Sequence, residues 1–235
     1  MPDPRPTLLL TRPEAQSRRF AHLFKARFGE DWPVITAPLM EVVPMMPPLP
    51  QADALIFTSE NAIACFLHSE PARDRLAYCV GVRTAKVAEA AGFRVVTGPG
   101  DAAALAEVIK ADYQGGVLFH PRGARVAHNL AEQLNLAGIE TYQAIVYEQM
   151  PLALPPRVRA LLTVNIPILV PLFSPRSAEL FAFEARDADA RLLLCPISRN
   201  AAEKLHGLPR ARIEIAQVPD ASGVMDAMAR QIGSF

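Results

Sequence analysis

APLMEVVP, residues 37–44, returns in altered form as AIVYEQMP, residues 144–151. Ala, Glu and Pro hold matched places in the two octets, and each octet ends an apolar stretch typical of a β-strand. Neither octet contains a Gly, Asn or Asp turn signal, and each leads into a proline-rich stretch. Such segments suit two extended crossings that lie side by side between two lobes. The alternative is that both are ordinary edge strands that end at proline.

The stretches around the octets repeat as well. TLLLTRPEAQ, from Thr7, resembles GVLFHPRGAR, from Gly116, and each continues through a helical pattern and a further strand to its octet. Likewise ALIFTSENAIACFL, from Ala54, resembles LVPLFSPRSAELFAF, from Leu169. The chain therefore reads as four segments, A, B, A′ and B′.

With the octets as crossings, the second lobe is inserted into the first. We predict one lobe from residues 1–37 with 152–235, a second lobe from residues 46–142, and linkers at 38–45 and 143–151. Short runs rich in Val, Leu, Ile and Phe alternate with Ala- and Arg-rich helical patterns through both lobes. This alternation predicts the α/β class, with two doubly wound parallel sheets that are covered by helices and joined by the two paired linkers.

Composition excludes several classes of protein. The chain has 235 residues and 51% hydrophobic residues, enough for two cores, and its formal net charge is zero. A broad nucleic-acid-binding face normally shows a basic balance, so no nucleic-acid partner is expected. The three cysteines are an odd number without CxxC spacing, which argues against a disulfide framework and a thiolate metal site.

Membrane and export signals are also lacking in the sequence. The N-terminal apolar run is short and is followed at once by Arg12 and Pro13, unlike a signal peptide. The most apolar internal stretch, LLTVNIPILVPLF, is interrupted by Pro167 and Pro171 and is shorter than the ~20 residues that a membrane span needs. We expect a cytoplasmic monomer with no membrane partner.

The loops that follow the strand-like runs share a composition that suits anion binding. In doubly wound sheets ligands bind at the carboxyl ends of the strands, where helix N-termini offer free N–H groups. Arginines follow five of these runs, at Arg12, Arg83, Arg122, Arg176 and Arg199. Small hydroxyl or amide residues accompany them: Thr11, Thr58, Ser59, Asn61, Thr84, Ser174, Ser177, Ser198 and Asn200. Two facing lobes would then line a cleft with anion-binding groups, although each Ser or Thr also suits a plain helix cap.

Familiar catalytic motifs are missing from the sequence. It contains no GxSxG, HExxH, Walker loop or helix-opening GxGxxG, and no paired carboxylates in the loop positions. His120 ends a strand next to Pro121 and is the histidine best placed to reach a cleft. This pattern favours a substrate that is reactive by itself and needs mainly to be held.

Six stretches in order resemble the uroporphyrinogen-III synthase family along nearly the whole chain. They are TRP near the start, FTSENAI, VGVRTAKVAEAAGFRV, LFHPRGARVAHNLAEQLNLAGIETYQAIVYEQ, FSPRSAELF and ISRNAAEKL. No one of these motifs is diagnostic, but their ordered set is fairly specific. The resemblance implies two α/β lobes, the second inserted in the first and joined to it by a two-stranded ladder.

The resemblance also implies a reaction. Hydroxymethylbilane, a linear tetrapyrrole with eight carboxylates, loses hydroxide from its ring A carbon and is cyclised with inversion of ring D, giving uroporphyrinogen III and water. The pyrrole nitrogen expels the hydroxide, so this lyase of tetrapyrrole biosynthesis needs no cofactor and no metal. The substrate is expected to arrive by transient handover from hydroxymethylbilane synthase.

The family's catalytic tyrosine lies on the returning linker, where this sequence has IVYEQ, so the role carries to Tyr147. Thr84 matches a Gly-x-x-Thr-Ala pattern and Ser59 matches a Thr-Ser strand end, but the second Gly-x-x-Thr-Ala copy reads SRNAA. Asn200 is the candidate to replace the missing threonine.

Other interpretations stay open at this point. Tyr147 could pack one face of the ladder without a catalytic role. The scaffold could also be a non-catalytic, regulatory binding module for an anion or a tetrapyrrole, or a two-domain sugar- or amino-acid-binding protein. The arginine loops and the lack of an export signal disfavour the last of these.

Overall fold

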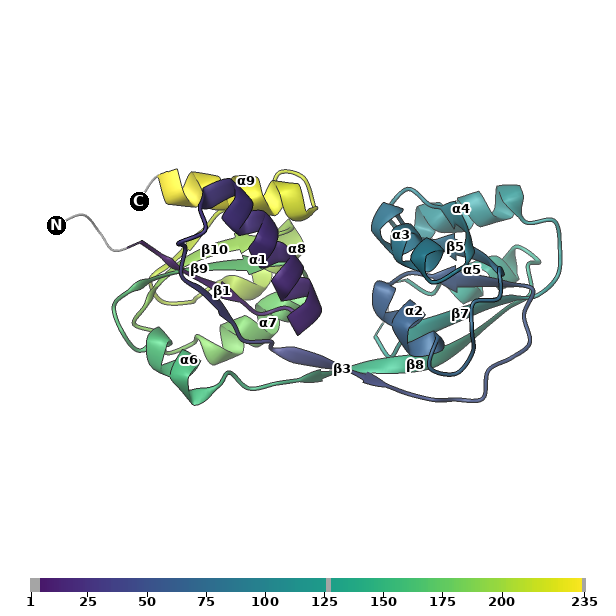
Figure 1. Cartoon of the computed structure of the whole chain (residues 1–235), viewed down its shortest axis with the longest axis horizontal. Helices are drawn as coiled ribbons and strands as arrows, with labels where there is room; N and C mark the ends of the chain where they lie inside the picture. The colour runs from purple at the N-terminus through teal and green to yellow at the C-terminus, as the bar shows by residue number, and fades with distance from the viewer. Residues whose placement is uncertain (1–4, 126–127, 234–235) are drawn as a thin grey trace. The chain divides into compact units, whose positions relative to one another are not determined.

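The computed structural model describes residues 5–125 and 128–233 (Figure 1). Contacts within the chain divide it into two compact units: unit 1 runs up to Glu41 and resumes at Met150, and unit 2 comprises Val42–Gln149. Each unit is built on a largely parallel sheet with helices on both faces. The predicted α/β class with parallel sheets is therefore confirmed.

Unit 1 contains a five-stranded sheet whose strands are all parallel. The spatial order is β11 (Ala211–Ile213), β10 (Arg191–Pro196), β9 (Pro167–Leu172), β1 (Thr7–Leu10) and β2 (Val34–Thr36). The central strands β1, β9 and β10 are apolar almost throughout, because both of their faces are covered by helices.

Two layers of helices cover this sheet (Figure 1). On one face α1 (Glu14–Phe28) and α9 (Ala221–Gly233) pack against Leu8 and Leu10. On the other face lie α6 (Pro156–Leu162), α7 (Pro175–Glu184), α8 (Arg199–Ala202) and the 3₁₀ turn η1 (Glu203–Leu205). Leu9 points to this second face, as the alternation of side chains along a strand requires.

Unit 2 contains a six-stranded sheet. Its order is β3 (Met40–Pro44), β8 (Thr141–Pro151), β7 (Leu118–Gly123), β4 (Ala54–Phe57), β5 (Leu76–Cys79) and β6 (Arg94–Thr97), and β8 to β6 are parallel. The two octets of the sequence thus lie in neighbouring strands, where the Met45 N–H donates to the Val146 carbonyl at 2.8 Å. β3 and β8 both run across the boundary between the two units.

The helices of unit 2 also form two layers. Helices α2 (Glu60–Phe66) and α3 (Val82–Ala90) share a cluster with Phe57 and Phe119, in which aromatic rings meet edge to face. Helices α4 (Ala102–Asp112) and α5 (Leu130–Leu136) cover the opposite face, around Ile56, Tyr78 and Leu118. The Tyr78 hydroxyl donates to Asp112 at 2.8 Å, which satisfies a buried polar group.

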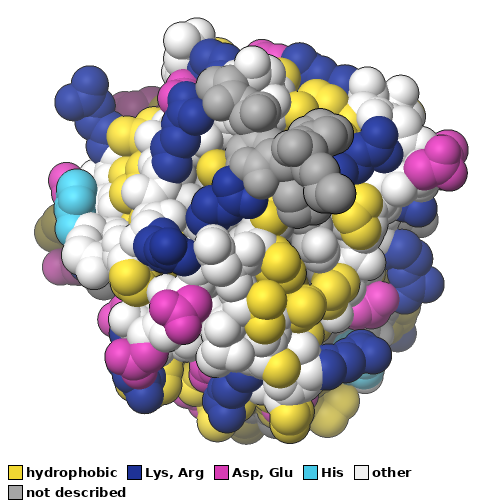
Figure 2. Space-filling model, turned by 90° about the vertical axis from the view of Figure 1, so that its left-hand side faces the viewer, with side chains coloured by type: hydrophobic (Ala, Val, Ile, Leu, Met, Phe, Trp, Pro, Cys, Tyr) yellow, Lys and Arg dark blue, Asp and Glu magenta, His cyan; other side chains and the backbone are white. Residues whose placement is uncertain are grey.

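The surface agrees with the neutral composition. On the face of the molecule that Figure 2 presents, basic and acidic side chains are interspersed. Among the described residues, no helix combines the length and the apolar character that a membrane crossing requires.

Two phenylalanines of α7 provide a test of the unit 1 core. Phe181 is fully buried, whereas Phe183, two positions along the same helix, is 65% exposed. Replacing a buried Phe by Ala leaves a cavity, so Phe181→Ala should lower the free energy of unfolding by roughly 3–5 kcal/mol. The matched variant Phe183→Ala should change it by less than about 0.5 kcal/mol. Urea unfolding measures both, and equal losses would contradict this packing.

Candidate functional site

The order of strands reverses once in each sheet, and this reversal locates the candidate site. In unit 1 the chain places β2 on one side of β1, and later places β9, β10 and β11 on the other side. Unit 2 adds β5 and β6 on one side of β4, and then β7 and β8 on the other. Where neighbouring connections diverge, the carboxyl ends of two strands are left uncovered, and open α/β sheets bind ligands there. The two edges are therefore β1/β9 in unit 1 and β4/β7 in unit 2.

In unit 2, predicted site residues that follow β4 meet side chains of β7 and β8 at this edge. Ser59, which follows β4, is the N-cap of α2, and its hydroxyl accepts from the Asn61 backbone N–H at 3.2 Å. The same hydroxyl is hydrogen-bonded to the phenol of Tyr147 on β8. Thr58 Oγ1 lies 3.2 Å from Nε2 of His120 on β7. Side chains that follow β4 and side chains of β7 and β8, which are far apart in the sequence, are thus in contact at one edge of the sheet.

Tyr147 is held in the core at the edge of unit 2. Its side chain is 8% exposed and belongs to the cluster of Phe57, Ile63 and Phe119. Burial raises the pKa of the phenol, the hydrogen bond from Ser59 lowers it, and the nearby Cys65 thiol raises it. Because the net shift is upward, the phenol keeps its proton at neutral pH and is able to donate it.

His120 is the polar residue that the sequence prediction left out of the site. It is 1% exposed, and its Nδ1 has no hydrogen-bond partner within the described part of the chain. Burial, together with a smaller effect of the positive charge of Arg122, lowers the pKa of the imidazole to about 4. A neutral ring with an unpaired Nδ1 favours the tautomer in which Nε2–H donates to Thr58, since a buried unpaired N–H costs more than a buried lone pair. The hydroxyl proton of Thr58 is then left to donate elsewhere.

The two predicted arginines of unit 2 already have partners. Arg83, in the first turn of α3, forms an ion pair with Glu60 at 2.8 Å, and its side chain remains half exposed. Arg122 donates from Nε to Gln143 at 2.9 Å and from Nη1 to the Gly123 carbonyl at 2.9 Å. Because it is half exposed, the Arg83 side chain can reach an anionic ligand, whereas Glu60 is only 17% exposed and stays largely within unit 2. Arg122 is tied more closely to the strand ends.

Thr84 and Asn61 occupy the first turns of the two helices on this face. Thr84 is 7% exposed, so its methyl and hydroxyl groups lie mostly within unit 2 rather than on its surface. Asn61 is half-buried beside the Ser59 cap. Both residues lie at the carboxyl edge of the sheet, as predicted, but Thr84 offers little surface to a ligand in this conformation.

In unit 1, Arg12 and Thr11 follow β1 directly. The Arg12 guanidinium lies over the Phe173 ring, 4.1 Å from its centroid, and Nε donates to Gln16 at 3.1 Å. This contact brings together the strand ends of β1 and β9, the reversal point of the sheet. Thr11 is fully buried, and its hydroxyl has no hydrogen-bond partner among the described residues.

The serines that follow β9 form a helix cap. The Ser174 hydroxyl accepts from the Ser177 N–H at 3.0 Å, and the Ser174 N–H donates to the Ser177 hydroxyl at 3.1 Å. This capping box satisfies the first turn of α7, so these hydroxyls already have a structural role. Arg176 pairs with Glu179 of the same helix at 2.7 Å.

The last predicted group follows β10. Ser198 caps α8 by accepting from the Ala201 N–H at 3.3 Å, while Arg199 and Asn200 are exposed. A cavity of about 480 Å³ lies beside them, lined by Ser198, Arg199 and the segment that follows β11. Asn200 does not belong to the lining of this cavity.

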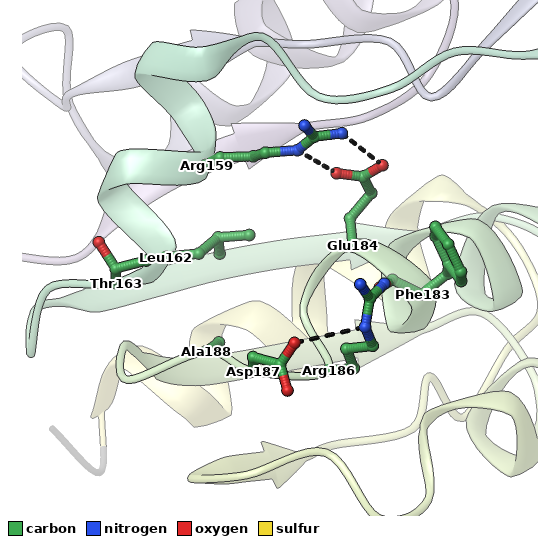
Figure 3. Close-up of a pocket in the computed structure, with 8 residues that line it drawn as sticks. All are labelled: Arg159, Leu162, Thr163, Phe183, Glu184, Arg186, Asp187 and Ala188. Carbon is green, nitrogen blue, oxygen red and sulfur yellow. Dashed lines mark hydrogen bonds and ion pairs between the residues drawn. The ribbon is translucent and has the colours of Figure 1, made fainter.

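A second cavity of unit 1 is distant from these residues. It has a volume of about 320 Å³ and lies between α6 and the carboxyl end of α7, the opposite end of α7 from Ser174. Figure 3 shows Arg159 and Glu184 facing one another above it, joined by two hydrogen bonds of 2.8 and 3.2 Å. No predicted site residue lines this cavity.

Metal ligands do not gather in the described part of the chain. No group of three or more His, Cys, Asp or Glu side chains there is arranged to hold a metal ion.

The buried imidazole predicts a specific pH dependence of stability. Well above pH 6.5 His120 is neutral in both the folded and the unfolded chain, so it contributes no slope there. Between pH 6.5 and about 4 the unfolded chain binds a proton that the folded chain does not, so stability falls by up to roughly 1.4 kcal/mol per pH unit. Urea unfolding of His120→Gln should lack this part of the slope. Parallel curves for the parent and the variant would contradict the assignment.

Comparison with known proteins places this geometry in one family. The family model described as uroporphyrinogen-III synthase HemD matches residues 20–226. The solved uroporphyrinogen-III synthetase from Helicobacter pylori is similar to the chain with a TM-score of 0.68 and 19% identity, over 96% of this chain and 99% of that one. A mutant uroporphyrinogen III synthase from Thermus thermophilus has a TM-score of 0.53 and 13% identity, over 97% and 100%.

A search of curated proteins returned no match. At these identities the solved structures support the fold alone, whereas the family model covers most of the sequence. Together with the edge at which Ser59 meets Tyr147, the match leads to one assignment. The chain belongs to the uroporphyrinogen-III synthase family.

Proposed function

We propose that this protein cyclises hydroxymethylbilane, with inversion of ring D, to uroporphyrinogen III and water. The observation that carries the proposal is the protonated phenol of Tyr147, held against Ser59 at the carboxyl edge of unit 2 in a chain of this family. We also propose that the reaction needs no cofactor, because the pyrrole nitrogen of ring A expels the hydroxyl group itself.

Tyr147 acts as the proton donor in this scheme. The C–O bond of the hydroxymethyl group breaks as the pyrrole nitrogen pushes in its electron pair, and the departing hydroxyl takes the phenol proton to leave as water. The substituted carbon of ring D then attacks the azafulvene. This attack gives a spiro intermediate, in which the bond from that carbon to the methylene bridge of ring C breaks and leaves a second azafulvene at ring C. The unsubstituted α-carbon of ring D attacks that azafulvene and then loses its proton, which restores the aromatic pyrrole and returns a proton to the phenolate, so the balance is one water released. Burial raises the pKa of the phenol, which favours its rapid reprotonation.

Binding is assigned to the strand ends around the two reversal points. The substrate carries eight carboxylates, and Arg12 and Arg83 are cations at these edges. Arg83 can turn toward a substrate carboxylate, because its side chain is half exposed. The backbone N–H groups at the starts of α1 and α3, which have no side-chain cap, offer further anion sites. The protein's main contribution is orientation, which brings ring D to attack through its substituted carbon.

The competing function is a non-catalytic binding module for an anion or a tetrapyrrole. The observation that favours it is that the threonine expected near Asn200 is missing. Asn200 itself is exposed and does not line the cavity beside Ser198. Both functions require the anion-binding loops, but only the enzyme requires the phenol of Tyr147.

We further propose that the chain forms two lobes, from residues 1–37 with 152–235 and from residues 46–142, with the second inserted through linkers 38–45 and 143–151. The support is that β1 and β4 lie in different sheets and that β3 and β8, which contain most of the linkers, are neighbours. The protein would act as a cytoplasmic monomer that receives its substrate from hydroxymethylbilane synthase.

Calorimetry of two matched core variants tests the proposed lobes. Phe57 and Phe181 are both fully buried, one in each sheet's core. If the lobes unfold separately, Phe57→Ala should lower the melting temperature of one transition and Phe181→Ala that of another, each by about 10 °C or more. A single transition that both variants lower equally would contradict two separate lobes.

The function itself is tested with Tyr147→Phe. We expect type III product to form roughly 10-fold to 100-fold more slowly, within the contribution of one positioned proton donor and softened because the bilane ionises unaided. Folding and KM should hold, since the ring remains and the binding groups are untouched. The measurement is the rate of type III product from freshly made hydroxymethylbilane, separated from type I.

The ratio of type III to type I product distinguishes the enzyme from the binding module. Hydroxymethylbilane closes spontaneously to the type I product, so a binding module would leave type I as the product in the presence of the parent protein. Tyr147→Phe that makes type III product at the parent rate would assign the phenol a packing role. Arg83→Gln is a useful companion variant, because loss of a carboxylate contact should raise KM and leave kcat nearly unchanged.

A further inference from the structure

The geometry points to Gly123 as a positioning residue for the Tyr147 phenol. Gly123 lies at a β-bulge, and its lack of a side chain leaves the space that the phenol ring occupies. This inference rests on the proposed function, in which the phenol is the proton donor. It adds a residue that has no side chain of its own and that nevertheless decides where the donor lies.

The bulge explains how Tyr147 reaches its present face of the sheet. Along β7 and β8, Arg122 pairs with Ile145, but Gly123 pairs with Tyr147, so Val146 is an extra residue on β8. In a regular strand Val146 and Tyr147 would point to opposite faces. Here both belong to the cluster under α2 and α3. The bulge therefore turns the tyrosine toward Ser59, and re-aiming a side chain is a recognised use of such irregularities.

Gly123 then supplies the space for the ring. A Cβ built on Gly123 would lie 2.7 Å from Cζ, 2.8 Å from Cε2 and 2.9 Å from the hydroxyl oxygen of Tyr147. These distances are far inside van der Waals contact, and the phenol end of the ring is the part that would be displaced. The adjacent Ala124 N–H donates to the Tyr147 carbonyl at 3.0 Å, which fixes the backbone of the tyrosine beside this gap.

Space is the reason for glycine at this position. The backbone of Gly123 does not adopt the left-handed conformation that disfavours other residues, unlike Gly138 with φ of 80°. Alanine could therefore take the same backbone angles, and the three heavy atoms nearest to its Cβ would all belong to Tyr147. Gly123→Ala is thus a selective way to move the phenol without removing it.

The kinetic test combines Gly123→Ala with Tyr147→Phe. Gly123→Ala should lower kcat for type III product by roughly 10-fold to 100-fold, as Tyr147→Phe does, with KM unchanged. The double variant should be no slower than Tyr147→Phe alone, because the displaced group no longer carries the proton. Gly233→Ala is the matched control, since a Cβ there meets nothing within 4 Å. Losses that multiply in the double variant, or parent activity in Gly123→Ala, would overturn the inference.

A spectroscopic test separates this inference from the proposed function. The chain has four tyrosines, so protein labelled with 3-fluorotyrosine should give four ¹⁹F signals, and Tyr147→Phe identifies that of residue 147. Gly123→Ala should shift this signal and leave the other three in place. If the parent makes no type III product, the proposed function fails while the shift still supports the positioning role. An unmoved signal overturns that role whatever the activity.

Stability in a second background covers the case in which Gly123→Ala folds poorly. If the added methyl group meets only the tyrosine ring, Gly123→Ala should lower the urea midpoint in the parent and leave it unchanged in Tyr147→Leu, where the ring is gone. An equal loss of stability in both backgrounds would show that the methyl group clashes elsewhere and would overturn the inference.

Discussion

The reversal of strand order in each parallel sheet is the constraint on which the rest of the structure depends. A parallel strand can be added only after a crossover, and the parallel strands are added in both directions from β1 in unit 1 and from β4 in unit 2. At that starting strand two neighbouring connections leave in opposite directions, so the carboxyl ends stay open. Thr58 and Ser59 in unit 2, and Thr11 and Arg12 in unit 1, occupy these ends because the chain direction places them there.

Several polar groups at these edges already have a structural role in the fold. Ser59 caps α2 while it bonds the phenol of Tyr147, and His120 bonds Thr58 from within the core. Arg83 is paired yet half exposed. Under the proposed function, in which the substrate ionises by itself, fixed donors would serve better than mobile ones, because preorganised groups do not have to be reoriented at the moment of reaction. The capping serines and the buried imidazole are fixed in this sense.

The two copies of the repeat have diverged in the way their strands end. Tyr147 stands on β8 where Met40 stands on β3, and both side chains are buried. The difference is that β8 carries a bulge opposite Gly123, which brings a polar ring to Ser59. Met40 has no polar group that needs a hydrogen-bond partner, so it can be buried without a bulge of this kind.

The α/β class, the parallel sheets and the edge that holds the candidate site could be read from the sequence by itself. Alternating apolar runs and helical patterns determine the class, and chain direction then places the residues after each run at a carboxyl edge. Only the tertiary structure decided which of those residues meet. The pairing of His120 with Thr58 and the packing of Tyr147 on Gly123 join segments far apart in the sequence, and a shift of one residue in strand register reverses the face on which a side chain lies. The bulge at Val146 is such a shift, set by packing of whole strands, and no local pattern in the sequence marks it.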